Sequence, residues 1–513
     1  MSSEVMNGAR LSGEANPVWD EVTGAVASGR RFAGLFGTAG GSGGSSPRAD
    51  TARPEGLVLS AHLAGRDGVT VAEVALPATA TSYPALTPRL GAAFWYEREI
   101  ADMFGVIPQG HPRPEPLLLP QPPGRALWPM PGEAGGPAAI EPDPRAVPLH
   151  VVGPGLFTIP HGPVRSGVVE SIEYLVETPG EDIPHLNMRV FYKHRGLEKR
   201  FEGMTAANGV LLAERVEGTA TVAHALAYCH ALERISGTAV PWAAALVRVL
   251  HAELERVACH LDVAMRLADG AGLAVATARF GWHKERVLRL VSRACGSRFG
   301  RGVVVPGGVG RLPLIGAADL LAEIGRLEKD VTADVGALMG TASFLDRLRR
   351  TGPLRPERAR EHGALGPVGK ASGYSDDARE FRPYDAYPSL GLRQPAPRSA
   401  GDVLDRLRVR WDEVGQSFHL LRQVADELAE GPAGPLRADC DVTGGRAVGW
   451  AEAPQGEVIY DLRLEHGRIT RCRPRSASFH NLVLMHELFA GDILTDFPFI
   501  EASLGLSVAG VTR

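Results

Sequence analysis

The stretch PWAAALVRVLHAELERVACHLDVAMRLADG, residues 241–270, decides the fold of most of this chain. Its large apolar side chains recur at intervals of three and four residues, which is the spacing of one face of an α-helix. They are Leu246, Leu250, Leu254, Val257, Leu261 and Met265. Pro241 stands where a first-turn proline is tolerated, and Gly270 ends the pattern. An apolar stripe of this length has to be buried, so we expect this helix in the core of a helical domain.

Further helical patterns lie on both sides of this stretch. The sequence predicts helices over residues 207–236, 278–297, 317–350, 401–430 and roughly 478–490. Alternation of apolar and polar residues predicts strands at residues 168–177 and 187–192, and a hairpin of residues 457–464 and 468–473. These patterns predict a large, mainly helical domain with β segments at its edges.

The N-terminal part has a different pattern. Residues 16–36 predict a short amphipathic helix followed by an apolar strand, and residues 57–63 and 69–76 predict two strands joined by a turn. The second half of residues 83–106 has helical spacing, whereas residues 37–54 have the composition of a loop. This order predicts a small α/β domain.

A proline-rich stretch, residues 108–154, separates the two parts and is incompatible with regular structure over most of its length. A chain of 513 residues is also too long for one ordinary core. We therefore predict an α+β protein with a domain at residues 1–149, which includes the linker, and a second domain at residues 150–513.

Composition excludes several classes of protein. Charged residues make up 22% of the chain and the net charge is −4, so nothing marks it as a nucleic-acid binder. Five cysteines without a CxxC pair indicate a reducing compartment rather than a disulfide framework. No run of eighteen apolar residues occurs, so we expect no membrane-spanning helix.

Several long motifs occur in the order of a known family. EREIADMFGV (residues 97–106) and GHPRP (residues 110–114) resemble the signature of the 30-kDa-type subunit of respiratory complex I. The later motifs resemble its 49-kDa-type subunit: FYKHRGLEKRFEG (191–203), PGGV (306–309), GPVGKASGYSDDAR (366–379), WAEAPQGE (450–457) and RPRSASFHN (473–481). One chain joining the two is similar to the large subunit of formate-hydrogenlyase-type, group 4 nickel–iron hydrogenases. The set covers residues 80–120 and most of 156–513, which makes the resemblance specific.

The resemblance implies a nickel–iron site that this sequence has lost. The family holds the two metals with four cysteine thiolates, in CGICxxxH and DPCxxC motifs. EGTATVAH (residues 217–224) and GLSVAGVTR (residues 505–513) align with these motifs. The four cysteine positions are therefore Glu217, Ala220, Ser507 and Gly510. Because soft sulfur ligands suit these metals and none remains, we expect no hydrogen chemistry and no metal bound by the chain.

In complex I the corresponding cavity binds quinone, and the resemblance implies candidate site residues here. We expect catalytic roles for His161, Glu217 and His224, and contact with a cofactor for Arg215, His194 and Arg195. His161 lies where the family has its quinone-binding histidine, and Arg215 matches an arginine beside the terminal iron–sulfur cluster. The family tyrosine that hydrogen-bonds quinone aligns with Gly218, which has no hydroxyl. Lys370 and Gln455 replace two family arginines, so both positions lose a planar, bidentate donor.

Structural interpretations of these residues stay open beside the functional ones. Glu217 is a candidate proton carrier or else pairs with Arg215 or another arginine. His194 and Arg195 have a site role or else end a strand and pair with Glu198. His224, two turns into the expected helix, is a site residue or a packed histidine. For a third group we favour a structural ion network over catalysis: Glu97, Arg98 and Glu99.

The resemblance also implies partners. A small iron–sulfur subunit would hold a 4Fe-4S cluster, and ferredoxin-like and antiporter-like membrane subunits would complete a complex on the cytoplasmic side of the membrane. Quinone is the implied acceptor, and an NADH-linked donor would be bound elsewhere, because no GxGxxG fingerprint opens a βαβ unit here. Two functions follow as alternatives: an oxidoreductase subunit that transfers electrons to a quinone-like acceptor, or a non-catalytic subunit that docks its partners.

Overall fold

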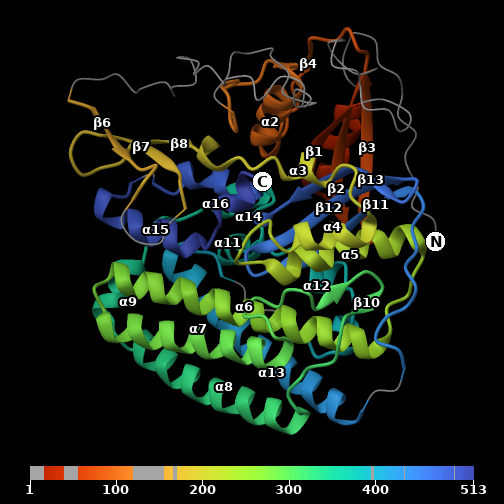
Figure 1. Cartoon of the computed structure of the whole chain (residues 1–513). Helices are drawn as coiled ribbons and strands as arrows, with labels where there is room; N and C mark the ends of the chain where they lie inside the picture. The colour runs from red at the N-terminus through yellow and green to blue at the C-terminus, as the bar shows by residue number, and fades with distance from the viewer. Residues whose placement is uncertain are drawn as a thin grey trace.

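The computed structural model describes residues 17–39, 56–119, 155–165, 170–393, 398–431, 434–489 and 491–513. The predicted boundary near residue 150 and most of the proline-rich stretch lie outside the described residues. Within them the protein is a mixture of helices and sheets, as the sequence predicts (Figure 1).

The N-terminal part is an antiparallel sheet with helices packed against it. The sheet has the order β1 (Arg31–Ala39), β2 (Leu57–Gly65), β3 (Gly68–Leu76). Helix α1 (Pro17–Ala27) packs on β2 and β3, and α2 (Phe94–Phe104) packs on β1. β4 (Ser82–Pro84) and β5 (Ile107–Gln109) form a short parallel pair. The predicted helix, strands and hairpin of this part are confirmed, while β5 adds a short strand at the start of the proline-rich stretch.

The large part is built around α6 (Trp242–Gly270), the helix that the opening stretch predicts. It packs against α7 (Ala274–Cys295) and α13 (Val403–Ala429), and α8 (Ala317–Met339) covers α7 and α13. Figure 1 shows these helices as one layer below the sheets. α6 is buried on nearly every side, including Arg248, Glu253 and Arg256. The apolar stripe is core as expected, and the polar face of the helix is buried as well.

Two sheets and several short helices cover this layer. The first sheet has the order β6 (Phe157–His161), β7 (Glu173–Thr178), β8 (His185–Arg189). The second has the order β11 (Gly445–Ala453), β12 (Gly456–Glu465), β13 (Arg468–Arg475). A small pair is formed by β9 (Val304–Val305) and β10 (Gly308–Val309). The short helices are α3 (Leu197–Phe201), α4 (Ala206–Ala213), α9 (Ala342–Leu348), α10 (Pro356–His362), α11 (Gly366–Ala371), α12 (Ala378–Phe381), α14 (Ala477–Leu482), α15 (Phe497–Leu504) and α16 (Val508–Val511). The predicted hairpin at β12 and β13 is confirmed.

The helix expected over residues 207–236 is wrong as one element. The chain forms α4, then an irregular loop, and then α5 (Thr221–Ser236). Arg195 accounts for part of the break, because its guanidinium binds the carbonyl oxygens of Arg215 and Val216, which a continuous helix would use. His224 therefore lies in the first turn of α5, not two turns inside a helix.

Three other boundaries differ. The helix expected over residues 317–350 breaks at Gly340 into α8 and α9, and the expected last helix is α14 followed by a 3₁₀ segment (Val483–Glu487). The strands expected at 168–177 and 187–192 are β7 and β8, and the second ends at Arg189, three residues early. Short-range periodicity does not locate such ends, because tertiary hydrogen bonds compete with the local ones.

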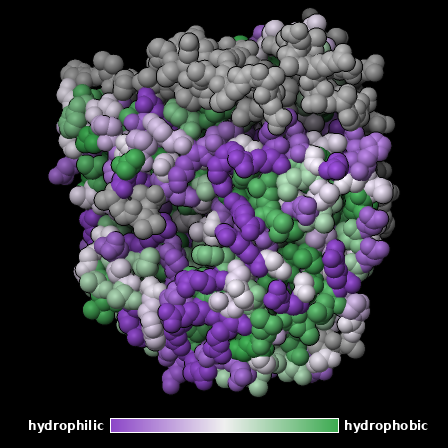
Figure 2. Space-filling model, viewed as in Figure 1, coloured by the Kyte–Doolittle hydropathy of each residue, from purple (hydrophilic) through white to green (hydrophobic). Residues whose placement is uncertain are grey.

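The two parts share one continuous hydrophobic core. Buried ion pairs also join them: Arg31 of β1 binds Glu457 of β12, and Glu99 of α2 binds Arg473 and Arg513. Figure 2 shows hydrophilic residues in a band across the middle of the viewed face, with hydrophobic patches on its right side. Across the part of the chain that the structure describes, no helix is long and apolar enough to cross a membrane.

Candidate functional site

The loop before α5 and the segment before α16 meet beside Glu217. A Cβ atom on Gly510 would lie 1.9 Å from Glu217 Oε2, so the carboxylate occupies the space next to this glycine. Ser478 of α14 joins the two segments: its hydroxyl donates to Glu217 Oε2 at 3.3 Å and accepts from the Ser507 N–H at 3.1 Å. Ala220, the residue before α5, is fully buried. The structure thus brings together Glu217, Ser507 and Gly510, three of the four positions that align with metal-binding cysteines.

His224 faces the same carboxylate from the first turn of α5. His224 Nε2 lies 3.3 Å from Glu217 Oε1, and its Nδ1 lies 2.8 Å from the hydroxyl of Tyr460 on β12. Burial raises the pKa of Tyr460 well above its usual value, so the phenol keeps its proton. In the tautomer that carries its proton on Nε2, His224 donates to Glu217 and accepts from the Tyr460 hydroxyl at Nδ1. Tyr460, His224 and Glu217 therefore form a buried chain of hydrogen bonds.

Arg195 holds the two segments together. Its guanidinium donates to the carbonyl oxygens of Arg215 at 3.0 Å and Ala509 at 2.6 Å, and also to that of Val216. Arg195 does not pair with Glu198, contrary to the structural interpretation from the sequence, because three carbonyl oxygens from both segments take its donors. Glu198 binds Arg471, Arg473 and Arg513 instead. Arg195 therefore acts as a positioning residue for this site.

The residues at the former metal positions do not fit a nickel–iron centre. A carboxylate, a methyl group, a hydroxyl and a hydrogen stand where the family uses four thiolates. The Ser507 hydroxyl is already engaged with Glu170, at 3.1 Å to each oxygen. Among the described residues, no three His, Cys, Asp or Glu side chains are grouped so that they could hold a metal ion. We derive no chemistry through such a centre.

A first prediction tests the packing of Glu217 against Gly510. Gly510→Ala is expected to lower the free energy of unfolding by about 1–3 kcal/mol, because the new methyl group displaces the carboxylate from Ser478 and His224. The same change in a Glu217→Ala background is expected to cost less, since the space is then empty. Chemical denaturation of the four proteins gives the coupling energy. Equal costs in both backgrounds would show that the two residues are not in contact.

His161 belongs to a separate cluster. It lies at the end of β6, stacks on Tyr174 at 6.4 Å between ring centroids, and meets Phe497 edge-on at 5.1 Å. Arg165 lies next to it, with Nη1 3.5 Å from His161 Nε2, and binds Glu501. Burial lowers the pKa of His161, and the charge of Arg165 lowers it further. None of these contacts reaches Glu217, so a joint catalytic role for His161 and Glu217 stays a prediction.

The remaining candidates surround the site without entering it. Arg215 is about half exposed, with its side chain 49% accessible, and its ion pair is with Glu214 at 3.5 Å. The expected pairing of Glu217 with Arg215 is therefore wrong, because the carboxylate turns inward to His224. Burial lowers the pKa of His194, whose Nδ1 has no hydrogen-bond partner. Glu99 is buried in ion pairs with Arg473 and Arg513, so the predicted structural ion network is seen for this residue. Glu97 accepts from the backbone N–H groups of Leu86 and Thr87 instead, and Arg98 donates to two backbone carbonyl oxygens.

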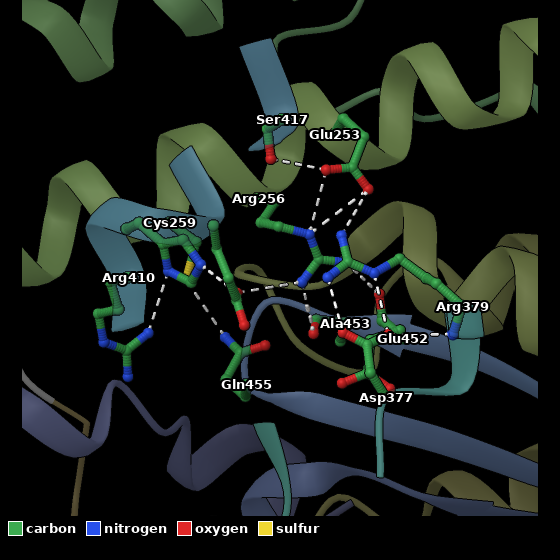
Figure 3. Close-up of polar contacts among 12 residues, drawn as sticks. Glu253, Arg256, Cys259, Asp377, Arg379, Arg410, Ser417, Glu452, Ala453 and Gln455 are labelled. Atoms are coloured by element: carbon green, nitrogen blue, oxygen red, sulfur yellow. Dashed lines mark hydrogen bonds and ion pairs between the residues drawn. The ribbon is translucent and has the colours of Figure 1, made fainter. Parts of the chain in front are cut away.

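A buried charge network surrounds the middle of α6 (Figure 3). Arg256 and Arg379 converge on Glu253, and Arg379 also binds Asp377. Lys370 meets two carboxylates, Asp377 at 2.6 Å and Glu413 at 2.7 Å, so the lysine at this position is fully paired in the buried network.

Gln455 is the other replacement, and it is less well satisfied. Its amide nitrogen lies 3.5 Å from Cys259 Sγ, and its buried carbonyl oxygen has no partner (Figure 3). A buried amide oxygen without a donor costs free energy. The change from arginine to glutamine therefore leaves an unfilled hydrogen-bonding position between β12 and α6.

A second prediction concerns Glu452, at the edge of this network. Burial, and then the charge of Asp377, raise its pKa to about 8, from an ordinary value of 4.5. Between these values the folded protein holds a proton that the unfolded chain releases, so this group makes stability fall as pH rises. Glu452→Gln removes this pH-dependent contribution to stability, and the amide oxygen can still accept a hydrogen bond from the Ala378 N–H. Relative to the wild type, we expect the variant to gain about 3 kcal/mol between pH 5 and pH 8. Urea denaturation at both pH values measures this, and a constant difference would contradict it.

A cavity of about 160 Å³ opens beside Gly218, on the other side of the loop before α5. α6 contributes His251, Glu255 and Cys259 to its wall. The apolar stripe of α6 gave no indication of these residues, because they lie on other faces of the same helix. Charged residues inside an otherwise apolar helix were the available signal. A second cavity, of about 640 Å³, lies between the N-terminal part and β8 and contains none of the predicted site residues.

Two family models match the chain. The model described as the 49-kDa subunit of respiratory-chain NADH dehydrogenase matches residues 273–440 and 436–513, and the model of its 30-kDa subunit matches residues 48–131. They match in the order that the motifs predict.

Individual relatives extend the similarity. The chain is 30% identical over 362 residues to the carbon monoxide-induced hydrogenase of Rhodospirillum rubrum, covering 70% of this chain and 99% of that protein. It is 29% identical over 471 residues to formate hydrogenlyase subunit 5 of Escherichia coli (strain K12), covering 87% of this chain and 79% of that protein. A chain of the solved archaeal membrane-bound sulfane sulfur reductase, a respiratory membrane complex, superposes with a TM-score of 0.65 at 25% identity, over 70% of this chain and 99% of that chain.

Proposed function

The chain belongs to the family of large subunits shared by group 4 membrane-bound hydrogenases and respiratory-chain NADH dehydrogenase, and we propose that it hosts electron transfer to a quinone-like acceptor in such a complex. The observation that carries this proposal is the replacement of the metal-binding residues at this site. The segments that bind metal in hydrogenases still meet here, but a buried acid–base chain replaces the thiolates. A metal-free site with a proton supply suits an organic acceptor better than hydrogen.

The residues of the site have separate roles in this proposal. In its protonated form Glu217 gives a proton to the reduced acceptor and is left as a carboxylate, which accepts a hydrogen bond from His224, 3.3 Å away. Tyr460 fixes the tautomer of His224 through its hydrogen bond to Nδ1. Arg195 keeps the loop before α5 in place. Glu217, His224 and Tyr460 are buried, which keeps water from them and strengthens the interactions among them.

We propose the partners from the same premise. A small subunit with a 4Fe-4S cluster would cover the loop before α5, where Arg215 and Gly218 are exposed. A positive charge at Arg215 would favour the reduced cluster. A ferredoxin-like subunit and antiporter-like membrane subunits would complete a complex at the cytoplasmic face of the membrane. NADH or another donor would be oxidised in those partners.

The test is acceptor reduction by the purified complex. With electrons supplied through the partners, the complex is expected to reduce a soluble ubiquinone analogue, and Glu217→Gln and His161→Ala are expected to slow it. Sulfane sulfur, offered separately, tests the acceptor of the structural relative. Reduction of neither acceptor above the rate of the variants would overturn the proposal and leave the alternative, a non-catalytic subunit that docks its partners.

A third prediction restores the family tyrosine. Gly218→Tyr is expected to lower the KM for the quinone analogue severalfold, because the new hydroxyl can donate to a quinone carbonyl. A Cβ atom at Gly218 meets nothing within 4 Å, so stability should change by less than about 0.5 kcal/mol. Gly218→Phe is the matched control, with the ring but no hydroxyl. Equal KM values for the two variants would show that the hydroxyl is not used.

A further inference from the structure

We propose that the cavity bounded by the start of α5, α6, α7 and residues 298–300 binds a single aromatic ring that carries a hydroxyl or carbonyl group, with His251, Thr219 and Glu255 as its hydrogen-bonding partners. This inference deepens the proposed function, on which it rests, by placing the ring of the acceptor in this cavity, here called the α6–α7 cavity.

The size and walls of the α6–α7 cavity fit one ring. Its volume is about 160 Å³, and an engineered apolar cavity of roughly 150 Å³ in another protein is known to take up benzene. Most of its wall is apolar: Val222, Leu254, Ala258, Leu288, Val291 and Phe299. An apolar pocket with a few convergent polar groups is the usual form of a small-molecule site.

Two polar atoms on the cavity wall have no partner in the protein. His251 is 2% exposed, and its Nδ1 makes no hydrogen bond. Burial lowers the pKa of His251 to about 4, so the ring is neutral at physiological pH. The Thr219 hydroxyl is also buried and without a partner. Such atoms cost free energy unless something binds them, and a hydroxyl or carbonyl on the ligand would supply the missing bonds.

Glu255 offers a hydrogen-bond donor to the same space. Its Oε2 accepts from the Val222 N–H at 2.7 Å, and its Oε1 accepts from the Ala223 N–H at 3.1 Å. Burial, opposed by these two bonds and aided by the charge of Glu217, raises the pKa of Glu255 to about 8. Near neutral pH the carboxyl group therefore keeps its proton and can donate it to a ligand oxygen.

The charges around the cavity largely neutralise one another. Asp262 of α6 binds Lys284 at 2.7 Å and Arg266 at 2.9 Å, and Arg298 binds Glu285 of α7 at 2.6 Å. Arg256 of α6 and Glu217 also face Glu255 and act on its carboxyl with opposite signs. A neutral, hydrogen-bonding ligand suits this environment better than an ion.

Phenol binding to the full chain tests the proposal, without any partner or electron donor. Phenol can donate to His251 Nδ1 and accept from Glu255, whereas toluene fills the same space without these bonds. Ligand-observed NMR titration at pH 6.5 is expected to give at least tenfold weaker binding for toluene than for phenol. Leu288→Trp, at a partly exposed wall position, is expected to weaken phenol binding at least tenfold by filling the cavity.

Further variants and a change of pH separate the contribution of the polar groups to binding from the contribution of packing. His251→Phe and Glu255→Leu are each expected to weaken phenol binding about five- to tenfold, whereas Glu255→Gln, which keeps a donor and an acceptor, should stay within about twofold. Binding should also weaken between pH 6.5 and pH 9 as Glu255 ionises, and not in Glu255→Gln. Thermal unfolding confirms that each variant is folded.

The outcomes distinguish this inference from the proposed function. If phenol and toluene bind equally, or Leu288→Trp binds phenol like the wild type, the α6–α7 cavity is not such a site, whatever the complex reduces. If phenol binds as expected but the complex reduces no acceptor, the binding site stands and the proposed function falls.

Discussion

Glu457→Gln is expected to lower the free energy of unfolding by about 3–5 kcal/mol. Glu457 is fully buried at the start of β12 and accepts hydrogen bonds from three guanidinium groups, those of Arg31, Arg382 and Arg475. Burial opposes its ionisation, but these three charges hold the pKa of Glu457 far below its usual value. Glutamine would leave the guanidinium groups buried without a counter-charge. Arg31 comes from β1, so the contact between the two parts should loosen as well.

Equilibrium unfolding in urea at pH 7 measures this change, with Glu361→Gln as the matched control. Glu361 also binds an arginine, Arg358, but its side chain is 62% exposed. Exposed ion pairs contribute little, so the control should stay within about 1 kcal/mol of the wild type. A Glu457→Gln protein as stable as the control would mean that this buried cluster is held by packing alone.

Glu217→Gln is expected to slow acceptor reduction by the complex at least tenfold, with stability changed much less than by Glu457→Gln. The amide can still bond to Ser478 and His224, at 3.3 Å each, but it cannot carry a proton to the acceptor. Loss of a positioned acid or base typically costs about 10²–10⁴ in rate, and alternative proton routes through water reduce that cost.

The pH dependence of the rate separates proton delivery from a structural role. Glu217→Gln should flatten the pH profile of acceptor reduction, and Glu217→Asp should restore part of the rate and of the profile. Ser507→Ala is the control, since its hydroxyl binds Glu170 and not Glu217. A Glu217→Gln complex with an unchanged rate and profile would favour the non-catalytic alternative.

Much of the fold could be predicted, because local patterns repeat over long segments. The apolar stripe of residues 241–270 marks α6, and the alternation around His466 and Gly467 marks the hairpin of β12 and β13. The prediction fails where a distant side chain intervenes. Arg195 takes the carbonyl oxygens that would have continued the helix through residues 214–220, and no local pattern contains that contact.

The candidate site also has features that the sequence predicted and features that it did not. The motifs align Glu217, Ser507 and Gly510 with metal-binding cysteines of the family, and the structure brings these three residues together. The motifs also pointed to His161, which lies in a different cluster. The structural alternative for Glu217, a pairing with Arg215, does not form either, because Arg215 pairs with Glu214. Spacing along the chain specifies which residue types are present, but the direction of a buried carboxylate depends on all the groups packed around it.

By itself, the sequence determined the family, the order of its elements and the absence of the four thiolates, because these depend on residue identity and short-range periodicity. The tertiary structure decided what occupies the emptied site. It turned Glu217 towards His224, placed its carboxylate in the space beside Gly510, and left a small cavity next to Glu255 and His251. These features arise from contacts between segments far apart in the sequence, such as Ser478 and Glu217, which no local pattern contains.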